Sequence, residues 1–599
     1  MTYLFINPPN YVVNSAPIPG IPMLISILKN NGDSAKFWDL NINLIEYLKQ
    51  SSFLFDFVSF GDNLSAKNIE DIFGFNSIEN FKIKWTEIKK NVENLYENLD
   101  FITYVLKEKT FFYNPIVLSY SLDILIKGLA SLSFFDSIFI EKLIPKISEY
   151  RSSSIDKDFF IDTNELENYI NSEFVFLREY YKTEIKKIEL LNISCIGISI
   201  GLPSQFVPAM ILGYLIKKKT SIHVNFAGSF FSSIYKDIKN IGDFLGKFCD
   251  SISYGDNEHT VTQLLDFIKK RSSIDSIENL IYKKQDKIFI NGAKSKEKIN
   301  YDLYPSFLEY TKVDYLLPEL VIPLKASVGC YWGKCIFCMC SASDIEYSIK
   351  PVNKLVDEIE FLSTKYNTKY FYFWDNAIPP EYLSQMADLL ISKKIKIVYS
   401  MYARFDEKFD AFLLKKLRRT GCIEIYWGLE STSESVLEYI NKGINPQTAK
   451  NVLKNSYKVG ISNKVYYILG LPTETIEEAK KNILFSKSIK KYIARFLVLP
   501  ECLFMNGSIM SQNKQFYMKE MLLTKREKSI IAEEILKLQI KEFNSIFTYN
   551  VYYILLLKHY GIHCLLALLK VCDFLMKNKF FLDKYINIHK ILYYNLLKK

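Results

Sequence analysis

The sequence predicts an α/β protein that consists of a doubly wound N-terminal domain, a partial (β/α)6 barrel and a C-terminal helical region. Three observations lead to this prediction. The first forty residues alternate strand, helix and strand, six strand–helix units follow one another from residue 320, and the alternation stops near residue 510. Strands that alternate with helices form parallel sheets, and active sites lie where such strands end. We therefore look for function in the loops that follow the strands.

The N-terminal domain is predicted over residues 1–278. It opens with an apolar strand at 2–6, a periodic helix within 20–32 that stops at a glycine, and a second strand at 35–40. This order is typical of a doubly wound, flavodoxin-like sheet. The alternation resumes after residue 191 with strands at 195–200, 222–227 and 251–254 and helices at 205–218 and 259–270.

A helical insertion of about 150 residues is predicted at 42–191, because its apolar residues are spaced for helices rather than strands. Two short apolar runs, 280–282 and 287–290, flank a turn and predict a hairpin. This hairpin begins a connector over residues 279–319.

The barrel is predicted over residues 320–509, and a C-terminal helical cap is predicted over 510–599. Runs rich in β-branched and aromatic residues alternate with helices of ten to fifteen residues. The predicted strands are 321–327, 370–374, 396–401, 423–427, 465–469 and 495–499, and the predicted helices include 355–365, 382–392, 411–419, 449–457 and 476–488.

Four cysteines lie in one glycine-containing loop directly after the first barrel strand. Cys330, Cys335 and Cys338 can wrap one face of a [4Fe–4S] cluster, because such clusters take cysteine thiolates, and three ligands leave one iron open. A structural zinc site with Cys340 as the fourth ligand is the alternative, but structural zinc usually takes ligands from two separate knuckles. Cys340 is either a buried thiol or an auxiliary group. The remaining cysteines are expected in the core: Cys195, Cys249, Cys422, Cys502, Cys564 and Cys572.

This loop resembles the cysteine motif of the radical S-adenosylmethionine (SAM) superfamily, although four residues rather than the usual three separate the first two cysteines. Phe337 matches the aromatic residue that precedes the third cysteine and helps to hold the adenine. Asp375 and Asn376 end the second strand, where members of the family contact the methionine amino group. Arg404, after the third strand, matches a position that reaches the SAM carboxylate or ribose.

The resemblance continues at the next two strand ends. Gly428 and Glu430 belong to a Gly-Leu-Glu-Ser segment that resembles the family's turn after the fourth strand, and Gly470 and Pro472 resemble its turn beside the adenine. Each segment alone could simply cap a helix or turn the chain. Their joint occurrence at successive strand ends, after the cysteine loop, is what predicts a SAM site.

The N-terminal domain resembles the cobalamin-binding-type module that is fused to many radical SAM enzymes. The matching stretches are 6–9, 20–41, 197–205, 227–228 and 254–256. The two resemblances together are closest to the subgroup associated with ribosomal peptide maturation. Because the turns 7–11 and 201–205 contain no histidine, any cobalamin here is expected to lack a histidine ligand from the protein. The five histidines of the chain lie elsewhere, at His223, His259, His559, His563 and His589.

The resemblance implies reductive cleavage of SAM to a 5′-deoxyadenosyl radical, with an electron donor such as flavodoxin or ferredoxin. It also implies a precursor peptide or small natural product as substrate. Cobalamin-dependent C-methylation is one expected outcome, and an epimerase or cross-linking enzyme without cobalamin is the alternative. A non-catalytic protein that binds a metal cluster is the alternative of another class.

Composition and charge narrow the remaining possibilities. The formal net charge of +10 comes from lysines spread along the whole chain of 599 residues, which is typical of solvated helix faces, so no nucleic acid partner is expected. The N-terminus lacks the pattern of a secretory signal, and the most apolar segment, 552–576, is interrupted by Lys558, His559 and Lys570. We therefore expect a cytoplasmic protein without a transmembrane segment.

Overall fold

The computed structural model describes most of the chain. Residues outside the description are 11–17, 65–77, 136–162, 173–174, 236–242, 256, 293–299, 342–345, 500–507, 513–521, 539–549, 562–564, 566–567, 570–578 and 598–599. Several residues that the sequence analysis singled out fall in these gaps, namely Tyr11, Asp256, Cys502, Cys564, His563, Lys570 and Cys572.

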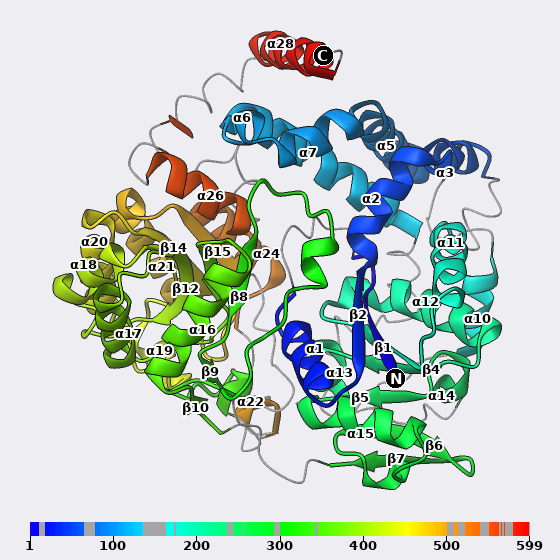
Figure 1. Ribbon diagram of the computed structural model, residues 1–599. Coiled ribbons are helices and arrows are strands. Elements are labelled where there is room, and N and C mark those ends of the chain that lie inside the picture. Colours follow the sequence, from blue (N-terminus) through cyan, green and yellow to red (C-terminus); the bar gives the residue numbers. More distant parts are fainter. Residues whose placement is uncertain are drawn as a thin grey trace.

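The N-terminal sheet has seven strands in the order β2-β1-β3-β4-β5-β6-β7 (Figure 1). Its first five strands pair in parallel, and β6 and β7 form the predicted antiparallel hairpin. The order reverses between β1 and β3, and such a reversal opens a crevice at the carboxyl ends of the two strands. The doubly wound prediction is confirmed. The strands are β1 (Thr2–Asn7), β2 (Ser34–Asp39), β3 (Cys195–Ser199), β4 (His223–Ala227), β5 (Ser251–Ser253), β6 (Leu280–Lys284) and β7 (Lys287–Asn291).

Helices accompany this sheet where the apolar periodicity predicts them. The predicted helix within 20–32 is observed as α1, which begins after Gly20, whose φ of 98° suits a residue without a side chain. The predicted helices 205–218 and 259–270 are observed within two residues of their expected ends. The helices of this part are α1 (Ile21–Asn30), α12 (Phe206–Lys219), α13 (Ser229–Ile234), α14 (Phe244–Lys247) and α15 (Glu258–Ile268).

The insertion is helical, as predicted, and starts two residues earlier than expected, because Asp39 caps the first helix through the backbone N–H of Asn41. Its helices are α2 (Leu40–Gln50), α3 (Phe53–Asp62), α5 (Ile78–Lys107), α6 (Lys109–Phe112), α7 (Pro115–Leu132), α10 (Thr163–Asn171) and α11 (Leu177–Glu189).

Helix α7 is an apolar helix that the sequence analysis did not single out. Within the described part of the chain, it alone is long and apolar enough to cross a membrane by length and composition, and 72% of it is buried inside the protein. Asp123 and Lys127 form an exposed ion pair of 2.8 Å on its surface. This pattern is typical of a core helix with one solvated stripe.

The second sheet has six parallel strands in the order β15-β14-β13-β12-β11-β8, as expected for a partial barrel, and helices cover its outside (Figure 1). Its strands are β8 (Val321–Leu324), β11 (Tyr370–Phe373), β12 (Val398–Arg404), β13 (Cys422–Glu430), β14 (Ser462–Ile468) and β15 (Arg495–Leu499). Its helices are α16 (Val352–Lys365), α17 (Pro380–Ser392), α18 (Ala411–Arg419), α19 (Glu434–Tyr439), α20 (Pro446–Lys458) and α21 (Ile476–Ile489).

The first barrel strand differs from its prediction. The expected strand 321–327 stops at Leu324, and Ser327–Val328 forms a separate strand, β9, that pairs antiparallel with β10 (Ser348–Ile349). The chain leaves the barrel here because the Asp375 carboxylate accepts hydrogen bonds from the backbone N–H groups of Ala326 and Ser327. The cysteine loop therefore starts from a two-stranded extension beyond the barrel.

Two further barrel strands end later than predicted. The third strand runs to Arg404 rather than ending at residue 401, and the fourth runs to Glu430, so that the predicted turn at 428–430 is the end of a strand. Both Arg404 and Glu430 consequently have positions fixed by sheet pairing.

C-terminal helices cover part of the barrel. Helix α24 packs against β15 and α21, and α26 packs against β12 and β13. Leu555 and Leu556 of α26 belong to the same buried cluster as Val398 and Ile423 of those two strands. The predicted helical cap is confirmed for the described residues of this region, in α22 (Ile509–Gln512), α24 (Lys525–Leu536), α26 (Asn550–Tyr560) and α28 (Lys579–Leu597).

Candidate functional site

The cysteine loop curls tightly at the end of β9. Gly329 and Gly333 have φ angles of 78° and 60°, a region that residues with side chains rarely adopt. The Cys338 N–H donates to the Cys335 carbonyl at 3.0 Å, which closes a turn between these two cysteines. The thiols of Cys330, Cys335, Cys338 and Cys340 are all free and partly exposed.

The thiols lie close enough to influence one another. A hydrogen bond with the Cys340 thiol lowers the pKa of Cys338 to about 6, whereas burial raises the pKa of Cys335 to about 11. Within the described residues, no three Cys, His, Asp or Glu side chains converge on a single point as the ligands of one metal ion do. A cubane cluster instead takes thiolates spread over several irons, and the three-cysteine donor set fits that group.

The loop docks on a tight turn formed by residues 440–443, which we call the anchoring turn. All four carbonyls of this turn accept hydrogen bonds. The first accepts from the N–H of Ile336 at 3.1 Å, and the second accepts from Nε1 of Trp332 at 2.9 Å. The third and fourth accept from Nη2 of Arg404 at 2.6 and 3.0 Å. The anchoring turn therefore ties the cysteine loop to the end of β12.

Trp332 is central to this docking. The guanidinium of Arg404 lies 3.9 Å from the centre of its ring, an arrangement in which the planar cation stacks on the aromatic face. A side chain at Gly443 would place its Cβ 2.2 Å from the same ring, and the φ of Gly443 is 62°. Glycine is thus required at this end of the anchoring turn.

Glu430 lies at the end of β13 in a strained backbone conformation. Its φ of 65° is rare outside glycine, and such strain of about 1–3 kcal/mol is found mainly at functional sites. Its Oε1 accepts a hydrogen bond from Nζ of Lys442 at 2.9 Å, and both residues are 8% exposed. A Cβ at Gly428 would lie 2.7 Å from that carboxylate oxygen, so Gly428 leaves the space that this ion pair fills.

Asp375 is buried against the protein, whereas Asn376 is exposed and contacts the cysteine loop. The buried Asp375 carboxylate accepts hydrogen bonds from Ser327 Oγ at 2.6 Å and from the N–H of Ala326 at 3.1 Å. Asn376 donates from Nδ2 to the Cys340 thiol at 3.2 Å. Asp375 therefore holds the chain where it leaves the barrel, and Asn376 contacts the fourth thiol of the loop.

The turn after β14 lies beside the cysteine loop. Gly470, with a φ of 69°, donates its N–H to Oε2 of the buried Glu474 at 2.7 Å, and Pro472 is buried. Burial raises the pKa of Glu474 to about 7. Leu471 belongs to a small apolar cluster that also contains Ile336, and Phe337 packs against this cluster.

The structure thus groups most of the predicted site residues around the mouth of the barrel. The sequence analysis gave no role to Trp332 and Glu474, which lie within its motifs, and did not single out Lys442 and Gly443. All four support this group. The Asn-Lys-Gly segment at 441–443 is a signal for a tight turn that could have been noticed. Its contact with a loop more than a hundred residues earlier could not.

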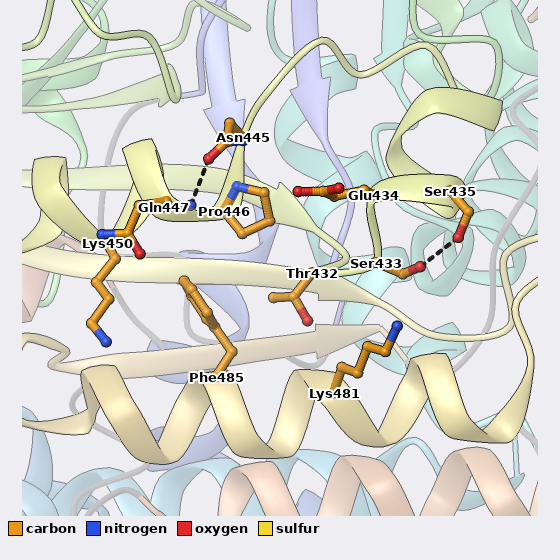
Figure 2. Close-up of a pocket in the computed structure, with 10 residues that line it drawn as sticks. All are labelled: Thr432, Ser433, Glu434, Ser435, Asn445, Pro446, Gln447, Lys450, Lys481 and Phe485. Carbon is orange, nitrogen blue, oxygen red and sulfur yellow. Dashed lines mark hydrogen bonds between the residues drawn. The ribbon is translucent and has the colours of Figure 1, made fainter.

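A separate cavity of about 460 Å³ lies outside this group, and Figure 2 shows its lining. It opens between the segment after β13, the start of α20 and the side of α21. It contains none of the predicted site residues, so we give it no role in the chemistry. Its lining residues are Thr432, Ser433, Glu434, Ser435, Asn445, Pro446, Gln447, Lys450, Lys481 and Phe485.

The crevice between β1 and β3 is the second candidate cofactor site. The buried Gln205 accepts through Oε1 from the N–H groups of Gly201 and Leu202 at 2.9 and 3.1 Å. Its Nε2 donates to Asn7 Oδ1 at 2.7 Å and to the Pro8 carbonyl at 2.9 Å. One side chain thus holds together the two loops that border the crevice. Leu202 is 48% exposed at this edge, beside the exposed Gly201, so an apolar face could pack against it.

The described histidines lie away from this crevice. His223 is the first residue of β4 and so lies at the amino end of that strand, whereas the crevice is at the carboxyl ends. Its Nε2 lies 2.8 Å from Ser251 Oγ. His259 is exposed near the start of α15, which follows β5, and β5 is two strands away from β3. His559 and His589 contact Tyr113 and Asn114 of the helical insertion.

Comparison with known proteins agrees with the interpretation of the cysteine loop as a radical SAM motif. Residues 324–485 match the radical SAM superfamily. The chain is 28% identical over 265 residues to an uncharacterized methyltransferase, PH0819, of Pyrococcus horikoshii, and 24% identical over 262 residues to the bacteriochlorophyllide d C-8(2)-methyltransferase of Chlorobaculum tepidum. Each match covers 42% of this chain and 55% of the relative. The chain thus spans about half the length of these curated relatives.

The solved structures that match this chain include two radical SAM enzymes. The methyltransferase TsrM of Kitasatospora setae, bound to tryptophan and a SAM analogue, has a TM-score of 0.49 at 11% identity, covering 86% of this chain and 76% of that one. The cobalamin-dependent enzyme OxsB with aqua-cobalamin has a TM-score of 0.44 at 16% identity, covering 57% and 50%.

Proposed function

We propose that the protein is a radical SAM enzyme whose cluster is held by Cys330, Cys335 and Cys338, on the premise that residues 324–485 match the radical SAM superfamily. The observation that carries the proposal is the docking of the cysteine loop on the anchoring turn, between the ends of β12 and β13. Members of the family use SAM and a [4Fe–4S] cluster. When bound, the cluster supplies the electron that cleaves SAM to methionine and a 5′-deoxyadenosyl radical.

The residues around the loop supply binding and positioning. Phe337, against its apolar cluster, and the turn with Gly470 and Pro472 are placed to border the adenine. Arg404 and Glu430 present a cation and a carboxylate at the strand ends, where the charged groups of SAM would be bound. Asn376 is held beside Cys340 at the loop, and Asp375 positions the loop itself. Gly428 provides the space for the Glu430 side chain.

We further propose that the N-terminal domain binds cobalamin and that the enzyme transfers a methyl group to carbon. Two supports are the relatives named as methyltransferases and the crevice at the point where the strand order reverses, the usual ligand position in such sheets. The loop after β3 carries an exposed glycine, Gly201, that allows close approach of a flat ligand. No described histidine borders this crevice, so binding would depend on burial of the corrin ring.

The substrate is proposed to be a peptide or a small natural product, and the electron donor to be a flavodoxin or ferredoxin. The peptide part of this proposal rests on the resemblance noted in the sequence. The two relatives described above are not named for peptides, and one is named for a bacteriochlorophyllide. A low-potential donor follows from the cluster chemistry of the family.

One experiment tests the radical SAM proposal. The purified chain is reconstituted anaerobically with iron and sulfide, reduced with dithionite and incubated with SAM, and 5′-deoxyadenosine is quantified by chromatography. We expect release from the wild type and none from a chain in which the three cluster cysteines are alanine. Equal release from both would contradict the proposal.

A second experiment addresses cobalamin. The chain is mixed with cob(II)alamin and studied by electron paramagnetic resonance. We expect binding, without nitrogen superhyperfine splitting that depends on a histidine of the protein. Splitting that disappears in a histidine variant would contradict the expected binding mode. Failure to bind any cobalamin would favour an epimerase or cross-linking enzyme over a methyltransferase.

A further inference from the structure

Lys442 is a buried lysine whose position the proposed chemistry does not yet explain. It is 8% exposed, and its Nζ lies 2.9 Å from Oε1 of Glu430 at the mouth of the barrel. A buried ion pair is a poor source of stability, because the cost of desolvating both charges can exceed their attraction. An apolar pair of similar volume would serve packing at least as well. The pair therefore requires a reason other than stability.

Backbone hydrogen bonds and backbone conformation fix the position of this lysine. Its N–H donates to the Leu437 carbonyl at 2.9 Å, at the end of α19, and its carbonyl accepts from Arg404. The residues on either side, Asn441 and Gly443, have φ angles of 52° and 62°, both in the left-handed region. The hydrogen bonds of its N–H and its carbonyl, together with the unusual backbone conformations of both neighbours, thus fix Lys442 within the anchoring turn.

The turn that carries Lys442 is bonded to the cysteine loop on both sides of Cys335. The N–H of Ile336, directly after Cys335, donates to the first carbonyl of the anchoring turn at 3.1 Å, and Nε1 of Trp332 donates to the second at 2.9 Å. Lys442 is the next residue of this turn, and a lysine ammonium is a cation at neutral pH. The charges of Lys442 and Glu430 are therefore fixed beside the loop that carries the cluster ligands.

We infer that Lys442 tunes the cluster as a fixed positive charge that raises its reduction potential, while the negative charge of Glu430 opposes this effect. The inference rests on the proposed function, because it requires a [4Fe–4S] cluster on Cys330, Cys335 and Cys338.

Reduction adds one electron to a group that already carries net negative charge. A nearby cation stabilises the reduced form more than the oxidised form, and a nearby anion does the opposite. Lys442 and Glu430 should therefore have effects of opposite sign on the reduction potential. A purely structural role of the pair would predict no such opposition.

The test is a reductive titration with dithionite, without SAM, in which the reduced cluster is followed by electron paramagnetic resonance. The variants are Lys442→Met, Lys442→Arg, Glu430→Gln and the double variant Lys442→Met/Glu430→Gln. Iron and sulfide per chain are measured in parallel. Lys269→Met serves as the matched control, because Lys269 is similarly buried and pairs with Asp33 at 2.6 Å in the N-terminal domain.

We expect the potential to fall in Lys442→Met and to rise in Glu430→Gln, each by at least a tenfold change in the ratio of reduced to oxidised cluster, which is about 59 mV for one electron. Lys442→Arg should stay near the wild type, and the double variant should lie between the two single variants. Lys269→Met should leave the potential unchanged.

Two results distinguish a failure of this inference from a failure of the proposed function. A wild-type chain that takes up no four-iron cluster contradicts the proposed function and the inference together. A fully loaded Lys442→Met chain whose potential equals that of the wild type contradicts the inference alone. If Lys442→Met does not fold, Glu430→Gln still decides, because a potential that fails to rise in that variant overturns the electrostatic role of the pair.

Discussion

The Arg404 guanidinium stacks on the Trp332 ring at 3.9 Å and donates two hydrogen bonds to carbonyls of the anchoring turn. One side chain at the end of β12 thus contacts both the cysteine loop and the turn on which that loop docks. Because a guanidinium is planar and carries several donors in fixed directions, it can make the stack and the hydrogen bonds at the same time.

The first prediction concerns Arg404. Arg404→Lys keeps the charge and loses the planar stack and at least one of the two hydrogen bonds, each of which contributes about 1.5–3 kcal/mol when charged. We expect SAM affinity, measured by equilibrium titration, to fall by about one to two orders of magnitude. Iron per chain should also fall after gel filtration, because the loop is less well held. Arg419→Lys, on the exposed end of α18, is the control and should change neither quantity.

The second prediction concerns the ligand set. Replacing Cys330, Cys335 and Cys338 together by alanine should abolish the brown cluster absorbance, because no other three thiols of the loop remain. Cys340→Ala should retain the cluster, since the proposed ligand set is complete without Cys340, whose thiol contacts Asn376 and Cys338. Iron analysis and visible absorbance check both variants. Equal loss of iron in Cys340→Ala and in the triple variant would show that the ligand set is different.

The third prediction concerns Gly443, where a methyl group would collide with Trp332. Gly443→Ala should destabilise the protein by about 1–3 kcal/mol through strain at a positive φ, and by more through the clash. Trp332→Ala in the same chain should remove the clash term and leave the strain. A double-mutant cycle of urea unfolding measures this coupling. Strictly additive effects of the two changes would mean that the two residues are not in contact.

The fourth prediction concerns Glu474 and pH. Burial raises its folded-state pKa to about 7, above the ordinary value of 4.5, so the folded protein binds more protons than the unfolded chain between these values. The contribution of Glu474 to the free energy of unfolding should therefore be largest below about pH 4.5. It should fall by about 3 kcal/mol as the pH rises to about 7. Glu474→Gln should remove this slope in urea midpoints measured from pH 5 to pH 8. An unchanged slope would assign the pH dependence to other groups.

Local patterns in the sequence determined most of the architecture. The period of the apolar residues distinguished strands from helices, and the order of strands in the chain predicted two sheets of parallel strands. The structure contains both, and the antiparallel hairpin joins the edge of the first. The spacing of Cys330, Cys335 and Cys338 indicated the cluster loop, since this signal lies within nine residues and requires no knowledge of the fold.

Only the tertiary structure decided how that loop is held and which residues surround it. Leu324 ends its strand because Asp375, some fifty residues later, binds the backbone just beyond it, and no local pattern reveals that contact. Lys442 and Trp332 are likewise brought together by the meeting of strand ends at one edge of a parallel sheet, although 110 residues of chain separate them. Periodicity along a chain specifies which face a residue presents, but contacts between distant loops depend on how complete strands and helices pack in three dimensions.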